Sequence, residues 1–83
     1  MTKYQTFLKR LMSGQADTSL AFDELCSLLQ CLGFILRIRG DHHIFSHADI
    51  PEIINLQPVG SLTKPYQVKQ VRNLLRKYHL DEA

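Results

Sequence analysis

The stretch RIRGDHHIFSH, residues 37–47, contains two arginines and three of the chain's four histidines. Histidine can ligate a metal or exchange a proton near neutral pH, because its unperturbed pKa is about 6.5. Arginine binds phosphate oxygens through paired N–H groups. The stretch therefore has the side chains for a metal site or for phosphodiester chemistry, according to where the backbone directs each of them.

A β-hairpin is predicted across this stretch. Residues 34–39, FILRIR, alternate as a strand does, and the two arginines lie on the face opposite the core. Gly40 and Asp41 fit a two-residue type II′ turn, because glycine is favoured at its first position. Residues 42–47, HHIFSH, then return as the second strand.

The short turn fixes the register of the hairpin. The opposed pairs are Arg39 with His42, Ile38 with His43, Arg37 with Ile44, and Leu36 with Phe45. In this register Arg37, Arg39 and His42 share the outer face. The core face is predicted to carry Phe34, Leu36, Ile38, His43 and Phe45. His47 has the parity of the core face but ends its strand, where it could reach solvent.

This arrangement disfavours a metal site. His42 and His43 point to opposite faces, and the sequence places no cysteine or carboxylate to join either one. It suits work on a phosphodiester, in which Arg37 and Arg39 hold phosphate oxygens while His42 gives or takes a proton. A solvated sheet face with exposed polar residues is the alternative explanation of the same pattern. We predict that neither a metal nor a cofactor takes part.

Helices and a third strand are predicted around the hairpin. In order, the chain forms a helix at residues 2–14, a loop to residue 19, a helix at 21–33, the two strands, a third strand at 53–57, and a closing helix from about residue 65 to residue 78. Gly14 and Gly33 end the first two helices, and Pro65 fits the first turn of the last. The predicted fold class is α+β with a three-stranded antiparallel sheet.

Size and composition indicate one folded domain over residues 1–83, since 45 % of the residues are apolar and 22 % are charged. No apolar run approaches the roughly 18 residues of a membrane span, and three basic residues interrupt the beginning of the chain. We therefore expect no membrane association and a cytoplasmic location. Cys26 and Cys31 fit neither a redox nor a zinc motif, and are expected to be core or half-buried residues.

The closing helix is basic. It contains Lys64, Lys69, Arg72, Arg76 and Lys77 with no acidic residue between them. Such a run can hold the phosphates of a nucleic acid, or it can simply solvate the outer face of a helix.

The residues LGFILRIRGDHHIF resemble the HicA family of toxin–antitoxin ribonucleases, whose pattern is a helix ending in G-F or G-W, a strand, then G-S-H and a second strand. INLQPVGSLTKPYQVKQVRNLL is similar to the third strand and closing helix of the longer members. The resemblance covers approximately residues 22–75, which leaves residues 1–19 as an N-terminal extension formed by the first helix and its loop. The chain departs from the family pattern at Asp41, where serine is usual.

This resemblance implies a fold similar to a double-stranded RNA-binding domain (dsRBD-like), α-β-β-β-α, behind the extra helix. It also implies a toxin that cleaves messenger RNA without a metal and is neutralised by a HicB-like antitoxin, which covers the catalytic histidine. By position in the motif, that histidine corresponds to His42 and the glycine to Gly40. The carboxylate of Asp41 could orient this histidine, and it would also repel RNA phosphate.

An endoribonuclease is the first function that these observations predict, with His42 as general acid or base in the attack of a ribose 2′-OH on the adjacent phosphorus. Its predicted RNA-binding residues are Arg37, Arg39, Gly40, Lys64 and Lys69. A non-catalytic RNA-binding module of the same fold is the alternative, and a face that docks an antitoxin-like protein is compatible with both. Tyr66 and Gln67 could contact RNA, although Tyr66 could equally pack under its helix.

Overall fold

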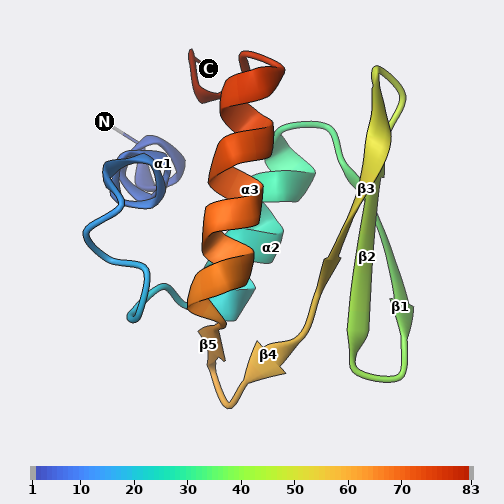
Figure 1. Ribbon diagram of the computed structural model, residues 1–83, viewed down its shortest axis with the longest axis horizontal. Helices are drawn as coiled ribbons and strands as arrows, with labels where there is room; N and C mark the ends of the chain where they lie inside the picture. The colour runs from blue at the N-terminus through green and yellow to red at the C-terminus, as the bar shows by residue number, and fades with distance from the viewer. Residues whose placement is uncertain (1, 83) are drawn as a thin grey trace.

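The computed structural model describes residues 2–82, which form three α-helices, a three-stranded antiparallel sheet and a small second hairpin (Figure 1). The elements are α1 (Lys3–Ser13), α2 (Phe22–Cys31), β1 (Ile35–Arg39), β2 (His42–His47), β3 (Ile50–Leu56), β4 (Pro58–Val59), β5 (Leu62–Thr63), α3 (Pro65–Lys77) and the short 3-10 helix η1 (Leu80–Glu82). The predicted α+β class is confirmed, with the three-stranded sheet between α2 and α3 in the chain and α1 before them.

Each helix begins or ends where the sequence provides a boundary. Thr2 and Gln5 form a capping box at the start of α1, with hydrogen bonds of 3.1 and 3.2 Å. Gly14 follows α1 with a φ of 74°, a left-handed conformation that glycine adopts without strain. Gly33, with a φ of 98°, follows α2, and Pro65 begins α3 as predicted.

The hairpin of β1 and β2 has the predicted register. Arg39 pairs with His42, and Ile38 pairs with His43. Gly40 has a φ of 62°, whereas Asp41 is not in a positive-φ conformation. A type I′ turn needs positive φ at both positions and a type II′ turn only at the first, so the turn is the predicted type II′.

The third strand differs from its prediction. β3 begins at Ile50, three residues earlier than expected, and includes Pro51. Proline is tolerated there because β3 is an edge strand, and the pairing with β2 is irregular between Phe45 and His47. Pro58 does not merely end the strand but opens the β4–β5 hairpin, which the sequence did not predict.

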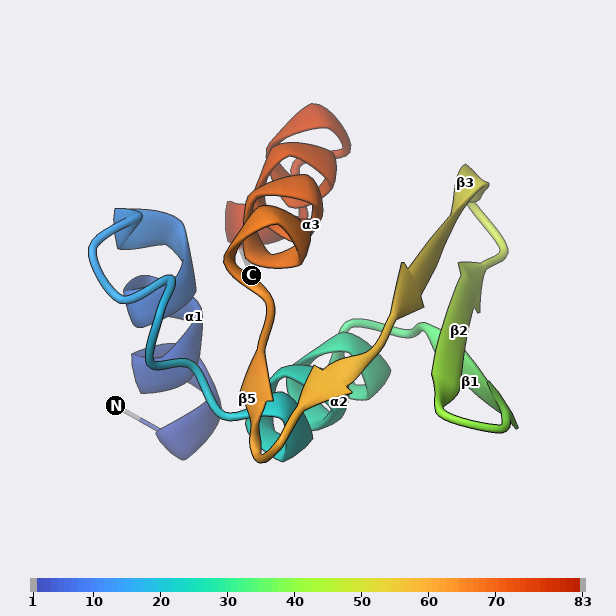
Figure 2. The same cartoon turned by 60° about the horizontal axis from the view of Figure 1, so that its bottom comes forward.

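The helices α2 and α3 lie between the sheet and α1 (Figures 1 and 2). One buried cluster joins all three layers, and includes Leu11 of α1, Leu25 and Leu29 of α2, Phe45 and Leu56 of the sheet, and Val68, Val71 and Leu75 of α3. Ile38 was expected in this core and is instead 57 % exposed. It lies on β1, an edge strand of which no residue is fully buried. Within residues 2–82, no helix has the length and apolar composition needed to cross a bilayer.

Candidate functional site

His47 is a structural residue. Its Nε2–H donates to the backbone oxygen of Leu32 at 3.2 Å, and its Nδ1 accepts the backbone N–H of Asp49 at 3.1 Å. The ring also meets the edge of Phe34, with 5.0 Å between the ring centroids. Because both nitrogens are used, His47 ties the end of α2 to the turn between β2 and β3.

The neighbouring histidines 42 and 43 diverge, as their strand positions predict. His43 is half-buried, and its ring lies 4.8 Å from that of Phe22 in an edge-to-face contact on the core side. His42 lies on the outer face, with 47 % of its side chain exposed. Within residues 2–82, no group of three or more histidine, cysteine or carboxylate side chains is arranged to hold a metal ion.

His42 leans toward β3, where two amide side chains meet its ring. Its Nδ1 lies 3.2 Å from Oδ1 of Asn55, and its Nε2 lies 3.3 Å from Nε2 of Gln57. The Asn55 oxygen can only accept, so Nδ1 of His42 carries the proton. The Gln57 amide nitrogen can only donate, so Nε2 of His42 holds a lone pair.

Gln57 connects the histidine to the helix α3. Its Oε1 accepts from Nζ of Lys64 at 3.4 Å, and its Nε2 also donates to Oδ2 of Asp41 at 3.4 Å. Its backbone N–H donates to Oε1 of the buried Gln67 at 3.3 Å. Because a lysine can only donate, the Gln57 oxygen faces Lys64 and its nitrogen faces His42. The network thus fixes both the orientation of this amide and the tautomer of His42.

A shallow cleft of about 220 Å³ adjoins His42. Its lining comes from the sheet side and from the first turns of α3: His42, Asn55, Gln57, Tyr66, Gln67 and Gln70. The helix α3 has no acidic residue in its first turn and no side-chain cap. The positive end of its dipole is therefore uncompensated beside the cleft, which favours an anion there.

The predicted RNA-binding residues of the hairpin lie outside the cleft. Arg37 and Arg39 are exposed, and neither side chain makes a hydrogen bond or an ion pair within residues 2–82. They share the outer face with His42, as the register requires. Gly40 meets no atom within 4 Å of the position that a Cβ would occupy, so a polynucleotide backbone can approach the turn closely.

The two predicted lysines are separated. Lys64 is half-buried and reaches His42 through Gln57. Lys69 is exposed and does not line the cleft. Its charge instead contributes to lowering the pKa of Asp17, which places Lys69 on the side of α3 that faces the loop between α1 and α2.

Most side chains of the basic run at residues 64–77 bind other groups of the protein. Arg72 is only 8 % exposed, donates to both carboxylate oxygens of Asp17 at 2.8 and 3.0 Å, and donates to the backbone oxygen of Leu11 at 3.0 Å. Arg76 donates to the backbone oxygen of Met12 at 3.2 Å. Two arginines thus bind the last carbonyl groups of α1, and the expectation that Arg72 holds phosphate or solvates the helix is wrong because this side chain is buried.

Sequence reasoning missed three of the cleft residues: Asn55, Gln57 and Gln70. The alternation of β3 shows which residues share a face with Asn55, but it does not show whether that face is the one that carries His42. The answer comes from the pairing of β2 with β3, in which Asn55 lies opposite Ile44. Tyr66 was left between two alternatives, and the structure shows it 57 % exposed at the cleft rather than packed under α3.

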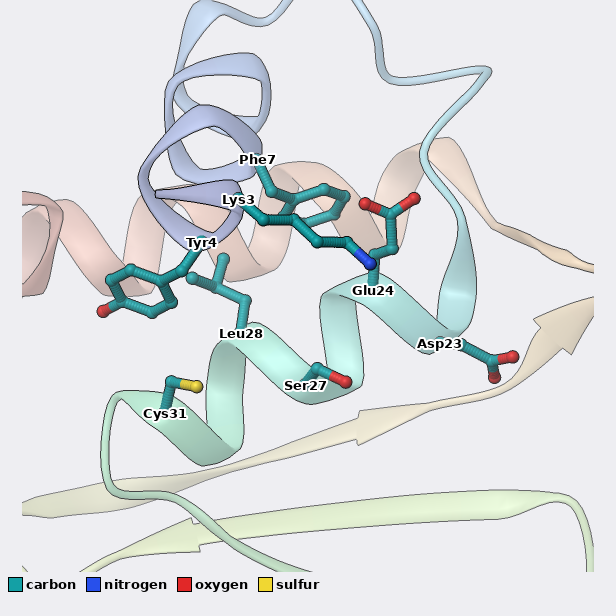
Figure 3. A pocket seen from close by; sticks show the side chains of 8 residues that line it. All are labelled: Lys3, Tyr4, Phe7, Asp23, Glu24, Ser27, Leu28 and Cys31. Atoms are coloured by element: carbon teal, nitrogen blue, oxygen red, sulfur yellow. The ribbon is translucent and has the colours of Figure 1, made fainter. Parts of the chain in front are cut away.

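A larger cavity of about 350 Å³ lies between α1 and α2 (Figure 3). Tyr4, Phe7, Leu28 and Cys31 line it together with Ser27 and the charged residues Lys3, Asp23 and Glu24. Cys31 is exposed, contrary to expectation, because it ends α2 on this outer side. Cys26 is buried as expected, and burial raises its pKa to about 11, so its thiol is not a nucleophile at neutral pH.

His42 and its amide partners therefore form the strongest candidate site among the described residues. The site combines an exposed acid–base group of defined tautomer, a nearby lysine, and the positive end of a helix. No family model, curated protein or solved structure matches this chain, so the residues of this site themselves carry the functional argument.

Proposed function

We propose that this protein is a metal-independent endoribonuclease in which His42 is the general base. The observation that carries the proposal is the hydrogen bonding of the His42 ring: Asn55 holds Nδ1–H and leaves the lone pair of Nε2 at the edge of the cleft. A base needs such a lone pair within reach of the proton that it removes.

The reaction follows from the groups around this nitrogen. Nε2 of His42 takes the proton of a ribose 2′-OH, O2′ attacks the adjacent phosphorus, and the bond from phosphorus to O5′ breaks. The leaving O5′ takes a proton from water, and the products carry a 2′,3′-cyclic phosphate and a 5′-hydroxyl. The 2′-OH replaces the Gln57 amide at Nε2, which exchanges readily because that contact is 3.3 Å long.

Positive groups on two sides would hold the RNA. Lys64, through its contact with Gln57, and the first turn of α3 lie beside the cleft, where they would stabilise the negative charge that develops on the phosphoryl oxygens. Arg37 and Arg39 lie on the sheet face and bind the flanking phosphates. The carboxylate of Asp41, 4.0 Å from Nε2 of His42, stabilises the imidazolium once the proton has been taken, while it weakens the approach of phosphate.

The resemblance of the hairpin and the closing helix to the HicA family extends this proposal. The chain would then be the toxin of a type II toxin–antitoxin system, acting on messenger RNA in the cytoplasm and neutralised by a HicB-like antitoxin. The outer face supports such a partner, because Ile35 and Ile53 are 69 % and 64 % exposed on the face that carries Arg37 and Arg39. An apolar patch with basic neighbours suits an acidic protein surface.

A non-catalytic RNA-binding module is the second candidate. One observation favours it: both ring nitrogens of His42 already have partners, and a carboxylate lies close to the one that would act as base. Binding would then persist without His42, and would weaken as salt rises because phosphate contacts release counterions.

Cleavage of single-stranded RNA in excess chelator separates the two candidates. The endoribonuclease proposal predicts that His42→Ala lowers the cleavage rate by about 100-fold or more, the usual contribution of general acid–base catalysis. The matched control is His43→Ala, on the opposite face of the same strand, which should cleave RNA at the wild-type rate per folded molecule. Equal cleavage by wild type and His42→Ala would refute the assignment, and RNA binding without any cleavage by the wild type would favour the binding module.

A further inference from the structure

The cleft beside His42 is richer in amide side chains than proton transfer requires. Four of its six lining residues carry a carboxamide: Asn55, Gln57, Gln67 and Gln70. Gln57 and Gln67 are bound to other protein groups. The Asn55 oxygen is bound to His42, which leaves its amide nitrogen and the whole Gln70 carboxamide available for a ligand.

Tyr66 provides an aromatic wall. It precedes Gln70 by four residues on α3, so the two side chains lie on the same face of the helix. Tyr66 is 57 % exposed although its ring is large and apolar. An exposed aromatic ring beside polar groups is the arrangement by which proteins stack an unpaired base and hydrogen-bond to its edge.

Gln70 matches the edge of a base. Its side chain is exposed and makes no hydrogen bond within the described part of the chain. A carboxamide offers one acceptor and one donor in a single plane, the arrangement with which glutamine or asparagine binds the amino group and ring nitrogen of adenine. The free amide nitrogen of Asn55 adds a second donor from the opposite wall of the cleft.

The size of the cleft sets the scale of the ligand. Its volume of about 220 Å³ is smaller than the roughly 300–1,000 Å³ of sites for drug-sized molecules. This space suits one base rather than a larger group. Because His42 lines the same cleft, that base belongs to a nucleotide next to the phosphate at which His42 would act.

We propose that this cleft is a nucleobase subsite for single-stranded RNA, in which Tyr66 stacks on one base while Gln70 and Asn55 hydrogen-bond to its edge, with adenine preferred. The identity of the ligand as RNA rests on the proposed function. The subsite adds a sequence preference that the acid–base group and the arginines cannot provide, because phosphate contacts carry no base information.

Binding of uncleavable RNA tests the subsite separately from catalysis. The full-length protein is titrated into labelled 2′-O-methyl oligonucleotides of adenylate, cytidylate or uridylate, which lack the attacking hydroxyl, and anisotropy is measured at low salt. We expect adenylate to bind about tenfold more tightly than the others, in line with one bidentate base contact. Gln70→Ala should remove this preference, and Tyr66→Ala should weaken binding of all three by about tenfold.

Two variants control for general damage. Tyr66→Phe keeps the ring and should bind as the wild type does. Gln30→Ala removes an exposed glutamine of α2 outside the cleft and should also bind normally. Equal affinity for the three oligonucleotides, or an adenine preference that survives Gln70→Ala, would overturn the proposal.

The outcomes distinguish this proposal from the catalytic one. If the wild type cleaves no RNA but shows an adenine preference that depends on Gln70, the subsite stands and the nuclease proposal fails. If the wild type cleaves RNA through His42 but binds the three oligonucleotides equally, the nuclease stands and the subsite is wrong.

Discussion

The two ends of α3 use polar residues in opposite ways. Toward its C-terminal half, Arg72 is 8 % exposed and bound to Asp17 by contacts of 2.8 and 3.0 Å. At its start, Gln57 contacts His42 at 3.3 Å and Lys64 at 3.4 Å. The His42 side chain is 47 % exposed. One cluster is buried and tightly bonded, while the other is open and loosely bonded.

This difference separates a structural cluster from a candidate site. A buried ion pair with short contacts cannot give up a partner without leaving a charge desolvated, so Arg72 is committed to the fold. The contacts of His42 and Lys64 are long and accessible to water, so a ligand can replace them at little cost. Contact length and burial therefore identify the available cations better than the count of basic residues does.

The largest expected effect concerns the structural end of α3. Arg72→Met keeps the volume of the side chain but leaves the Asp17 carboxylate without its partner, and should lower the free energy of unfolding by about 3 kcal/mol. Urea denaturation measures this loss. Lys77→Ala, on the same helix, removes the exposed ion pair with Glu52 of β3 and should leave the urea midpoint unchanged. If both variants lost the same free energy of unfolding, the buried ion pair would stabilise the fold no more than the exposed one.

The positioning of His42 provides the second test. Asn55→Ala removes the acceptor that holds Nδ1–H, and should lower kcat for RNA cleavage by about 10- to 100-fold, with a smaller rise in KM from the lost hydrogen bond to the base. Asn55→Asp keeps an acceptor oxygen and should recover most of kcat. Because Asn55 is exposed, the urea midpoint should stay at the wild-type value in both variants. A rise in KM with no loss of kcat would show that Asn55 binds the base but does not position His42.

Acid should weaken the structural end of α3. The hydrogen bond from Arg72 is the main cause that lowers the pKa of Asp17 below its ordinary value of 3.8. The pair therefore stabilises the fold fully above that ordinary value, and its contribution is lost as the pH falls toward the folded-state pKa. Asp17→Asn cannot titrate, so its free energy of unfolding should fall less steeply than that of the wild type below about pH 4. If the free energy of unfolding fell equally steeply with pH in the two proteins, the Asp17–Arg72 pair would not be the cause of the acid sensitivity.

The smallest expected effect is at the open end. Asp41→Ser removes a carboxylate 4.0 Å from Nε2 of His42 and should raise kcat/KM for RNA by about threefold at low salt, because phosphate is no longer repelled. The gain should disappear at high salt, where the interaction is screened. A decrease in activity would show instead that the stabilisation of the imidazolium by Asp41 outweighs its repulsion of phosphate.

The sequence predicts well what depends on near neighbours. The turn at Gly40 set the register of the first hairpin, and the register placed His42 beside the arginines on the outer face. The sequence predicts poorly the features that depend on contacts between distant segments. The position of Asn55 needed the pairing of β2 with β3, and the burial of Arg72 needed the docking of α1, neither of which has a local pattern.

The basic run illustrates the second limit. In the sequence, Arg72 and Lys69 are equivalent charges on one helix, and only the packed structure buries one and exposes the other. Gln67 is a similar case, since a glutamine near the start of a helix gives no indication that it will be buried against the end of β3.

The contact between Arg72 and Leu11 joins residues that are 61 positions apart. On the ribosome, α1 is therefore made long before the arginine that binds its last carbonyl groups exists. An isolated helix as short as α1, 11 residues, is only marginally stable in water, so α1 depends on packing against α2 and, later, against α3. A ribosome that stalls before Arg72 therefore leaves a nascent chain in which α1 lacks the hydrogen bond from Arg72 to Leu11 and its packing against α3.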